Sequence, residues 1–255
     1  MLNETAEDQA IGESKHAARR LRDYRREDYR DFWKGDRKAL LHDMEAAVVS
    51  ELAPQEAGWF FDVGAGHGRL LPLYAREDRR IVLVDYAMNL LQTAKKSNDK
   101  DNIHCVVADA YHLPFRSETF RGGLSIRTFH HMEDPGAFLA ELSRVTRAGA
   151  EILVEYSNKR NLLRLLRRGA AAFRKDHECY SGMLFGTHPA CFDRLCREAG
   201  LRVVMNRGLG SFERLWKSGR FPTGVVRLVE RLAGRLLGPM GLEPLHFSRL
   251  RKTER

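Results

Sequence analysis

The sequence predicts an α/β protein: a doubly wound, mostly parallel sheet with helices on both faces. The first observation is a series of short, nearly continuous apolar runs, as expected of strands buried on both faces; they cover residues 59–63, 81–85, 103–109, 122–126 and 150–156. The second is that helical patterns alternate with these runs, which is typical of parallel strands joined by helical crossovers. The third is the length of 255 residues, enough for one large core.

The elements can be followed in order along the chain. Residues 1–15 look like a loose tail, and a helical pattern then runs over residues 16–52 until Ala53-Pro54 breaks it. The first strand ends at a run of glycines, and the next helical segment carries Pro72 in its first turn, where proline is tolerated. The later elements of the core alternate as strand IVLVD, helix AMNLLQTAKKS, strand IHCVVAD, strand GGLSI, helix PGAFLAELSRVTRA and strand AEILVEY.

After residue 156 the pattern is less regular. The segment NLLRLLRRGAAAFRK looks helical, PACFDRLCREAG is a helix that stops at Gly200, and LRVVMNRGLG is a strand. The segment FPTGVVRLVERLAGRLLG then predicts an amphipathic helix. Its apolar residues share one face and Arg227, Arg231 and Arg235 share another, so this helix either covers the core or lies on a membrane surface.

Composition restricts the possible classes. Hydrophobic residues make up 43% and charged residues 30%, which favours a folded chain. No apolar run approaches the ~20 residues of a membrane span, and MLNETAEDQA lacks the apolar segment of a secretion signal. With four cysteines in no paired spacing, we expect a cytoplasmic protein. The net charge of +9 leaves nucleic acid, an anionic membrane and acidic substrates open as partners.

A glycine-rich loop follows the first strand, in the sequence DVGAGHGRL. Bare backbone at this point lets the chain turn sharply and lets a ligand lie directly on it, through Gly64, Ala65, Gly66 and Gly68. A dinucleotide fingerprint would place its third glycine where Arg69 stands. Asp62, just before the first glycine, would repel a pyrophosphate and suits a ligand with an ammonium or sulfonium group.

Two further acids end the next two strands. Asp85 can accept hydrogen bonds from two ribose hydroxyls, and Tyr86 beside it can pack against the nucleoside. Asp109 can accept from an adenine amino group, with Ala110 presenting its backbone to the ring. A cationic amino-acid head, a ribose and an adenine together describe S-adenosylmethionine.

Five motifs in the same order carry a family resemblance: DVGAGHG, IVLVDYA, VVADAYHLPF, GGLSIRTFHHMEDP and LSRVTRAGAEILVEY. Together they resemble the class I S-adenosylmethionine-dependent methyltransferases, within the broad type 11 group that includes the ubiquinone and menaquinone biosynthesis methyltransferases. The resemblance covers roughly residues 40–206. It implies a seven-stranded Rossmann-like sheet, methyl transfer, and S-adenosyl-L-homocysteine as the product. Arg121 departs from the Phe-Asp that usually introduces the fourth strand.

We expect the chain to divide into five parts: an N-terminal tail and helix (1–40), the cofactor-binding Rossmann-like core (41–157), a substrate-side insert (158–188), the remaining helix and strands of the core (189–215) and a basic amphipathic extension (216–255). The insert is unlike that of the better-known members, so the substrate cannot be carried over from them.

Methyl transfer is an in-line displacement that needs a base only when the acceptor must lose a proton. His130 and His131 follow the fourth strand and are candidate bases, although either could instead have a structural role. His188, in the insert, is a third candidate. Arg127 could contact the cofactor, orient an anionic substrate or lie on the surface. No Cys-x-x-Cys spacing occurs, so we expect no metal.

The expected acceptor is a small or lipid-like molecule. Nucleic-acid methylation is the first alternative, prompted by the charge. The Asn/Asp-Pro-Pro-aromatic element of amino-group nucleic-acid methyltransferases is absent after the fourth strand, where RTF stands. A non-catalytic S-adenosylmethionine-binding partner protein is the second alternative. The acceptor atom and the oligomeric state do not follow from the sequence.

Overall fold

The computed structural model describes residues 33, 35–160, 174–181, 184–210, 221–237, 240 and 242–254. The tail predicted for residues 1–15 and the start of the first predicted helix lie outside these residues. The first half of the described chain contains α2 (Asp36–Leu52), β1 (Gly58–Val63), α3 (Leu71–Tyr74), β2 (Arg79–Asp85), α4 (Met88–Ser97), β3 (Ile103–Val107) and β4 (Phe120–Ser125). The second half contains the short 3₁₀ turn η2 (Phe129–His131), α5 (Pro135–Val145), β5 (Thr146–Ser157), β6 (His177–Ser181), β7 (Leu184–Thr187), α7 (Pro189–Glu198), β8 (Leu201–Leu209), α9 (Thr223–Leu237) and β9 (Leu245–Lys252).

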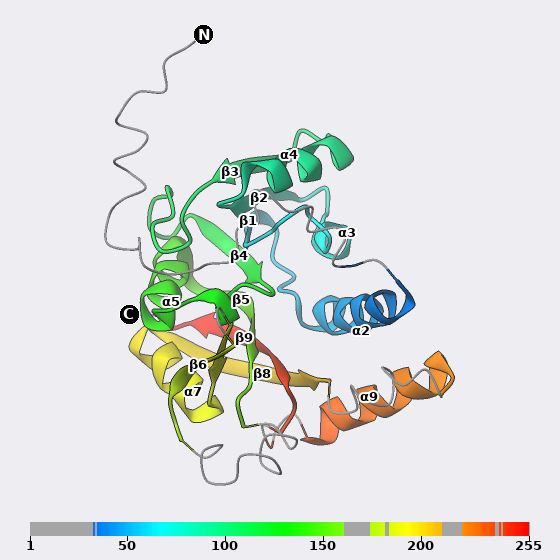
Figure 1. The fold of residues 1–255 in the computed structure, drawn as a ribbon. Helices are drawn as coiled ribbons and strands as arrows, with labels where there is room; N and C mark the ends of the chain where they lie inside the picture. Colours follow the sequence, from blue (N-terminus) through cyan, green and yellow to red (C-terminus); the bar gives the residue numbers. More distant parts are fainter. Residues whose placement is uncertain are drawn as a thin grey trace.

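Seven strands form the main sheet in the order β3-β2-β1-β4-β5-β9-β8. The neighbours from β3 to β5 pair in parallel, whereas β9 is antiparallel to both β5 and β8. The chain builds outward from β1 to β3 and then returns to the other side of β1 with β4 (Figure 1). The switch of strand order therefore lies between β1 and β4, where open α/β sheets bind their ligands at the carboxyl ends of the strands. The predicted fold class is confirmed.

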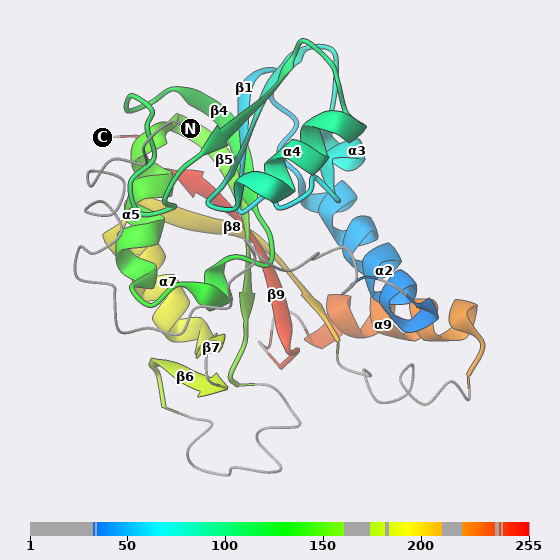
Figure 2. The ribbon, with the colours of Figure 1, turned by 45° about the horizontal axis from the view of Figure 1, so that its top comes forward.

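Helices cover both faces of this sheet. Successive strand residues point to opposite faces, so Phe60 and Phe61 belong to different apolar clusters. One cluster joins β1 to α2, α3 and α4, and the other joins the sheet to α5 and α7. Figures 1 and 2 both show α2 and α9 on one side of the sheet and α5 and α7 on the other. The two clusters are the core that fixes the strand ends.

The seventh strand lies farther along the chain than we expected. Residues 245–252 fall in the part that the sequence analysis assigned to an extension, yet β9 occupies the gap between β5 and β8. The run LHFSRLRK contains two arginines and a lysine, so its apolar alternation is weak. Its cations are accommodated because Glu151 on β5 forms ion pairs with both Arg249 and Arg251.

Local chemistry explains where two helices begin. Asp134 caps α5 by accepting a hydrogen bond from the backbone N–H of Ala137 at 3.0 Å, and Pro135 occupies the first turn. His188 caps α7 in the same way. Among the described residues, no helix combines the length and the apolar content that a bilayer crossing requires.

Candidate functional site

The glycine loop lies at the carboxyl end of β1. Gly64, Gly66 and Gly68 have φ angles of +80°, +55° and +74°, the left-handed region that favours glycine. A Cβ on Gly64 would lie 1.8 Å from Oγ1 of Thr128, so the loop passes directly against the segment that follows β4. A Cβ on Gly66 would meet nothing within 4 Å. The loop is therefore packed against the protein at Gly64, whereas at Gly66 it leaves space in which a ligand could lie.

Asp85 holds this loop in place. Its Oδ2 accepts a hydrogen bond from the Gly66 N–H at 2.8 Å, and its Oδ1 accepts one from the Ala87 N–H at 2.9 Å. Burial raises the pKa of this carboxyl, while the backbone donors act in the opposite direction. Each carboxylate oxygen can accept a second hydrogen bond. Asp85 can thus order the loop and still receive a hydroxyl of a ligand.

Asp62 is more deeply buried than we expected for a carboxylate that contacts the cationic amino-acid end of a ligand. Its side chain is buried, and its Oδ2 accepts a hydrogen bond from the Tyr74 hydroxyl at 2.5 Å. Burial raises the pKa of Asp62 to about 7, although the Tyr74 hydrogen bond lowers it in part. The structure therefore places Asp62 in the core with Tyr74 as its partner, a contact that the sequence did not reveal.

Apolar side chains are exposed at the carboxyl ends of β2 and β3. Tyr86, Met88 and Val107 are exposed, and Val107 pairs in register with Asp85 across the two strands. The sequence analysis identified Tyr86 but missed the other two, because neither carries a chemical group that marks a site. A flat apolar ligand ring would remove these side chains from water.

Asp109 lies at the same edge. Its Oδ1 accepts a hydrogen bond from the Tyr111 N–H at 2.9 Å, and its Oδ2 is 3.2 Å from Nδ1 of His112. Ala110 between them is half-buried. The carboxylate remains accessible, as its predicted contact with an adenine amino group requires.

Arg127 stands at the end of β4 with a φ of +62°, a conformation that costs a residue with a Cβ some strain. Its Nε donates a hydrogen bond to Glu45 Oε1 at 2.6 Å, and Glu45 on α2 also accepts from Arg69 at 2.8 Å. The Arg69 guanidinium lies 3.7 Å from the centre of the Trp33 ring. Arg127 is thus part of a buried network between α2 and the sheet, an arrangement that the sequence analysis did not include among its alternatives.

A buried carboxyl and a histidine face each other beside this network. The Arg127 N–H donates to Glu155 Oε2 at 2.9 Å, and the same oxygen is 3.9 Å from Nδ1 of His130. Glu155 is fully buried, and its Oε1 has no hydrogen-bond partner among the described residues. Burial raises the pKa of Glu155 to about 7, against the opposing charge of Arg127. An unpartnered buried carboxyl oxygen is costly and points to a function.

The structure brings two of the three predicted bases together. The ring centres of His130 and His131 are 4.2 Å apart, and burial together with the neighbouring His131 and Arg127 keeps the pKa of His130 well below its ordinary value. His188 instead accepts a hydrogen bond from the Ala190 N–H at 3.1 Å as the cap of α7. In the part of the chain that the structure describes, no three His, Cys, Asp or Glu side chains are grouped to hold a metal.

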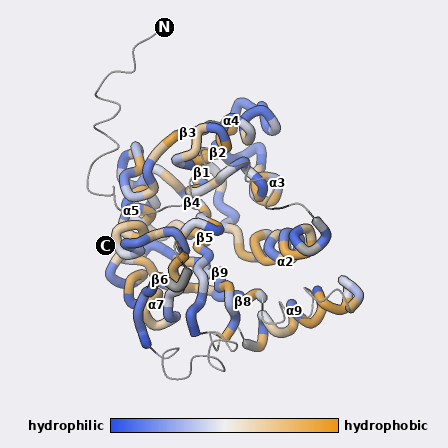
Figure 3. Tube along the Cα trace, in the orientation of Figure 1, coloured by the Kyte–Doolittle hydropathy of each residue, from blue (hydrophilic) through white to orange (hydrophobic). Residues whose placement is uncertain are grey.

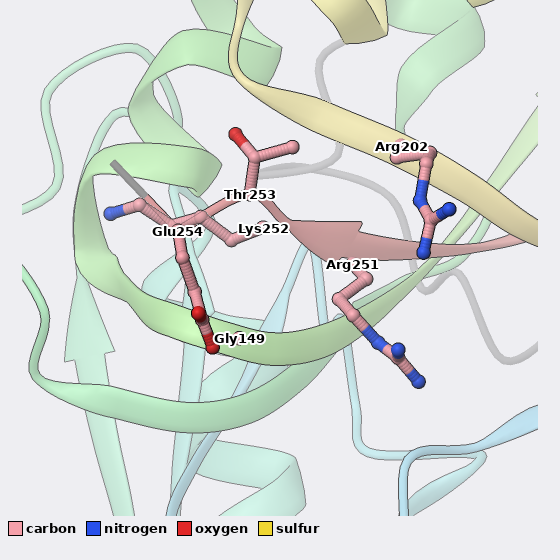
Figure 4. Close-up of a pocket in the computed structure, with 6 residues that line it drawn as sticks. All are labelled: Gly149, Arg202, Arg251, Lys252, Thr253 and Glu254. Carbon is pink, nitrogen blue, oxygen red and sulfur yellow. The ribbon is translucent and has the colours of Figure 1, made fainter.

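One cavity lies at the opposite, amino edge of the parallel strands. It has a volume of about 300 Å³ and is lined by Gly149, Arg202, Arg251, Lys252, Thr253 and Glu254 (Figure 4). Lys252 donates to the backbone carbonyl of Thr146 at 2.8 Å. This basic surface is remote from the glycine loop, and ligands of open α/β sheets bind at the other edge.

The strand order, the glycine loop and the acid at the end of β2 are those of a Rossmann-like methyltransferase fold, and comparisons with known proteins agree. Residues 61–154 match the family model described as a methyltransferase domain. These residues therefore form a domain similar to the class I S-adenosylmethionine-dependent methyltransferases that the sequence analysis predicted.

Two curated relatives illustrate the similarity. The demethylmenaquinone methyltransferase of Thermobifida fusca is 28% identical over 116 residues, which cover 44% of this chain and 49% of that protein. The O-methyltransferase cnsE of Penicillium expansum is 23% identical over 172 residues, 62% of this chain and 56% of that protein. The matches thus span about half the length of these relatives.

A solved structure extends the likeness in fold. The geranyl diphosphate C-methyltransferase of Streptomyces coelicolor A3(2) superposes with a TM-score of 0.59 at 15% identity, covering 85% of this chain and 84% of that one. That protein was crystallised with S-adenosyl-L-homocysteine. S-adenosylmethionine, the predicted cofactor, is confirmed for this family, and the open backbone at Gly66 beside Asp85 fits such a ligand.

Proposed function

We propose that this chain transfers a methyl group from S-adenosylmethionine to a small or lipid-like acceptor by in-line displacement. The observation that carries the proposal is the glycine loop, open at Gly66 and tied to Asp85, at the switch point of the sheet. The names of the relatives, a demethylmenaquinone methyltransferase and an O-methyltransferase, support an acceptor of this kind.

The cofactor site uses the residues that end β1, β2 and β3. Backbone at Gly64, Ala65, Gly66 and Gly68 approaches the amino-acid end, and Asp85 accepts the ribose hydroxyls. Asp109 and Ala110 contact the adenine edge, while Tyr86, Met88 and Val107 cover its ring. Arg127 positions this site through its ion pair with Glu45. When bound, the cofactor supplies a methyl group already activated on a sulfonium, so the protein mainly aligns the acceptor.

A transfer experiment tests the proposal. The full chain is incubated with cofactor labelled in its methyl group and with separated lipid, small-molecule, RNA and protein fractions of a cell extract. We expect label in the lipid or small-molecule fraction, and much less label at the same cofactor concentration when Asp85→Asn replaces the natural chain. Label in RNA alone would instead support a nucleic-acid methyltransferase, and cofactor binding with no labelled product would support a non-catalytic partner protein.

In this proposal, Glu155 and His130 together remove a proton from the methyl acceptor. Glu155 is fully buried, so its ionised form receives the acceptor's proton through neutral His130 when a hydroxyl or an acidic C–H is methylated. The pKa of Glu155, raised to about 7, would place this step in the neutral range. We expect the turnover of the natural chain to rise with pH through about 7, and Glu155→Gln to lower it by roughly 10²–10⁴-fold with cofactor affinity retained.

Stability gives a second readout for Glu155 that needs no acceptor. Its folded pKa of about 7 exceeds the ordinary value of ~4.3, so burial of the charged form costs stability as the pH rises from ~4 to ~7. We therefore expect the free energy of unfolding of Glu155→Gln, relative to the natural chain, to increase over this interval in urea titrations. A constant difference between the two proteins would contradict the burial of an ionisable group here.

A further inference from the structure

The outward face of α9 carries an inference that is independent of methyl transfer. We infer that this face is a docking surface for an anionic lipid membrane. Four observations support it: the way α9 is anchored, the apolar stripe it exposes, the cations beside that stripe and the lack of an exposed acid on the helix.

The anchored side of α9 is made of small and polar residues. A Cβ on Gly234 would lie 2.4 Å from the backbone oxygen of Gly208, so the helix and β8 meet almost backbone to backbone. Glu230 is buried and accepts a hydrogen bond from the Gly210 N–H at 3.1 Å. Val226 and Ala233 are buried on the same side. This close contact fixes which side of α9 faces the sheet.

Four other apolar residues of α9 point away from the sheet. Val225, Leu228, Leu232 and Leu236 are 49%, 58%, 50% and 73% exposed. Their spacing of three and four residues aligns them as one stripe along the helix. Phe221 before the helix and Met240 after it are also exposed. A contiguous exposed apolar surface of this kind marks an interaction site.

The charges beside the stripe indicate that the partner of this surface is anionic. Arg227, Arg231 and Arg235 are exposed and recur every four residues, so they form a row along one side of the stripe. Glu230, the sole acid between Thr223 and Leu237, is buried. The outer surface of α9 therefore combines apolar side chains with cations. Figure 3 shows that hydrophobic and hydrophilic residues alternate along this helix.

An anionic bilayer matches both features at once. Its acyl boundary takes up the apolar stripe while its headgroups pair with arginines at the edge. The anchoring on β8 and the ion pair of Arg227 with Asp43 on α2 hold the helix as a rigid part of the protein. The stripe can thus enter the interface without unfolding any described element.

Flotation of the full chain with vesicles tests this inference. We expect binding to phosphatidylcholine vesicles that contain about 30 mol % phosphatidylserine, and little binding to phosphatidylcholine alone. The double variant Leu228→Gln/Leu232→Gln should lower the partition coefficient by roughly tenfold per leucine. Arg231→Gln/Arg235→Gln should weaken binding to anionic vesicles and reduce its dependence on salt.

A matched control separates this surface from the overall positive charge. Arg147→Gln/Arg202→Gln removes the same charge from exposed positions at the amino edge of the sheet. We expect this control to bind anionic vesicles like the natural chain, and S-adenosyl-L-homocysteine affinity to stay unchanged in all variants. Equal loss in the control, retained binding after the leucine changes, or no vesicle binding by the natural chain would overturn the inference. A change of oligomeric state on replacing the leucines, without vesicle binding, would assign the stripe to a second copy.

Discussion

Replacing Gly64 with alanine is expected to destabilise the protein by about 2–5 kcal/mol. Two effects add at this position. The φ of +80° is unfavourable for any residue with a Cβ, and the new Cβ would lie 1.8 Å from Oγ1 of Thr128 and 2.8 Å from its Cβ. Neither group can yield easily, because the Thr128 side chain is itself buried and the Gly64 N–H donates to the Val84 carbonyl at 2.8 Å. Urea titration of both proteins measures the difference.

Gly66→Ala is the matched control for this prediction. Gly66 shares the positive φ, but no atom lies within 4 Å of its added Cβ. We expect a stability loss of only about 1–2 kcal/mol, together with a disproportionate loss of affinity for S-adenosyl-L-homocysteine, since the methyl group would occupy the space left for the ligand. Equal destabilisation by the two substitutions would show that the contact with Thr128 does not limit Gly64.

The parts of the site that the sequence predicts are those specified by neighbouring residues. The strand ending at Val63, the glycines after it and the acid ending the next strand are short-range patterns, and the structure places them together at the switch point. The backbone geometry that a bound nucleoside requires can be recognised in the sequence, because glycine is the residue that adopts it most easily. The cofactor followed from these glycines and the acids near them, whereas the fold class followed from the alternation of strand and helix patterns.

The parts that the sequence does not predict depend on distant residues. Glu45 and Arg127 are 82 positions apart, and each could be read alone as a surface charge. Glu155 stands in the apolar run ILVEY, where its neighbours dominate the pattern. The signal that could have found it is a single acid inside a strand expected to be buried on both faces, since such a group needs a partner or a function.

The orientation of α9 shows a second limit of prediction from the sequence. Periodicity identifies two faces of the helix but not which of them meets the sheet. The choice depends on how closely the backbones approach, and the contact between Gly234 and Gly208 admits only the small-residue face. A helix that looks suited to covering the core with its leucines therefore exposes three of them, Leu228, Leu232 and Leu236.

Asp85→Asn is expected to weaken the binding of S-adenosyl-L-homocysteine by roughly 10- to 150-fold, the equivalent of losing ~1.5–3 kcal/mol of charge-assisted hydrogen bonding. The amide keeps one oxygen for a backbone N–H, but its NH₂ group must then face the donor that remains, Gly66 N–H or Ala87 N–H. The substitution thus removes the negative charge offered to the ribose hydroxyls and also releases one end of the glycine loop. Calorimetric titration gives the affinity, and thermal melting separates it from stability.

Asp99→Asn makes the same chemical change at an exposed position, where the carboxylate pairs with Lys95 on the surface. Such a pair contributes little to stability, and Asp99 lies beyond the end of α4, so the affinity should equal that of the natural chain. The comparison separates the effect of the position of the carboxylate from the effect of its charge. An equal loss of affinity in both variants would reflect the net charge of the protein. Unchanged affinity in Asp85→Asn would instead remove this carboxylate from the cofactor site and leave the glycine loop alone to account for binding.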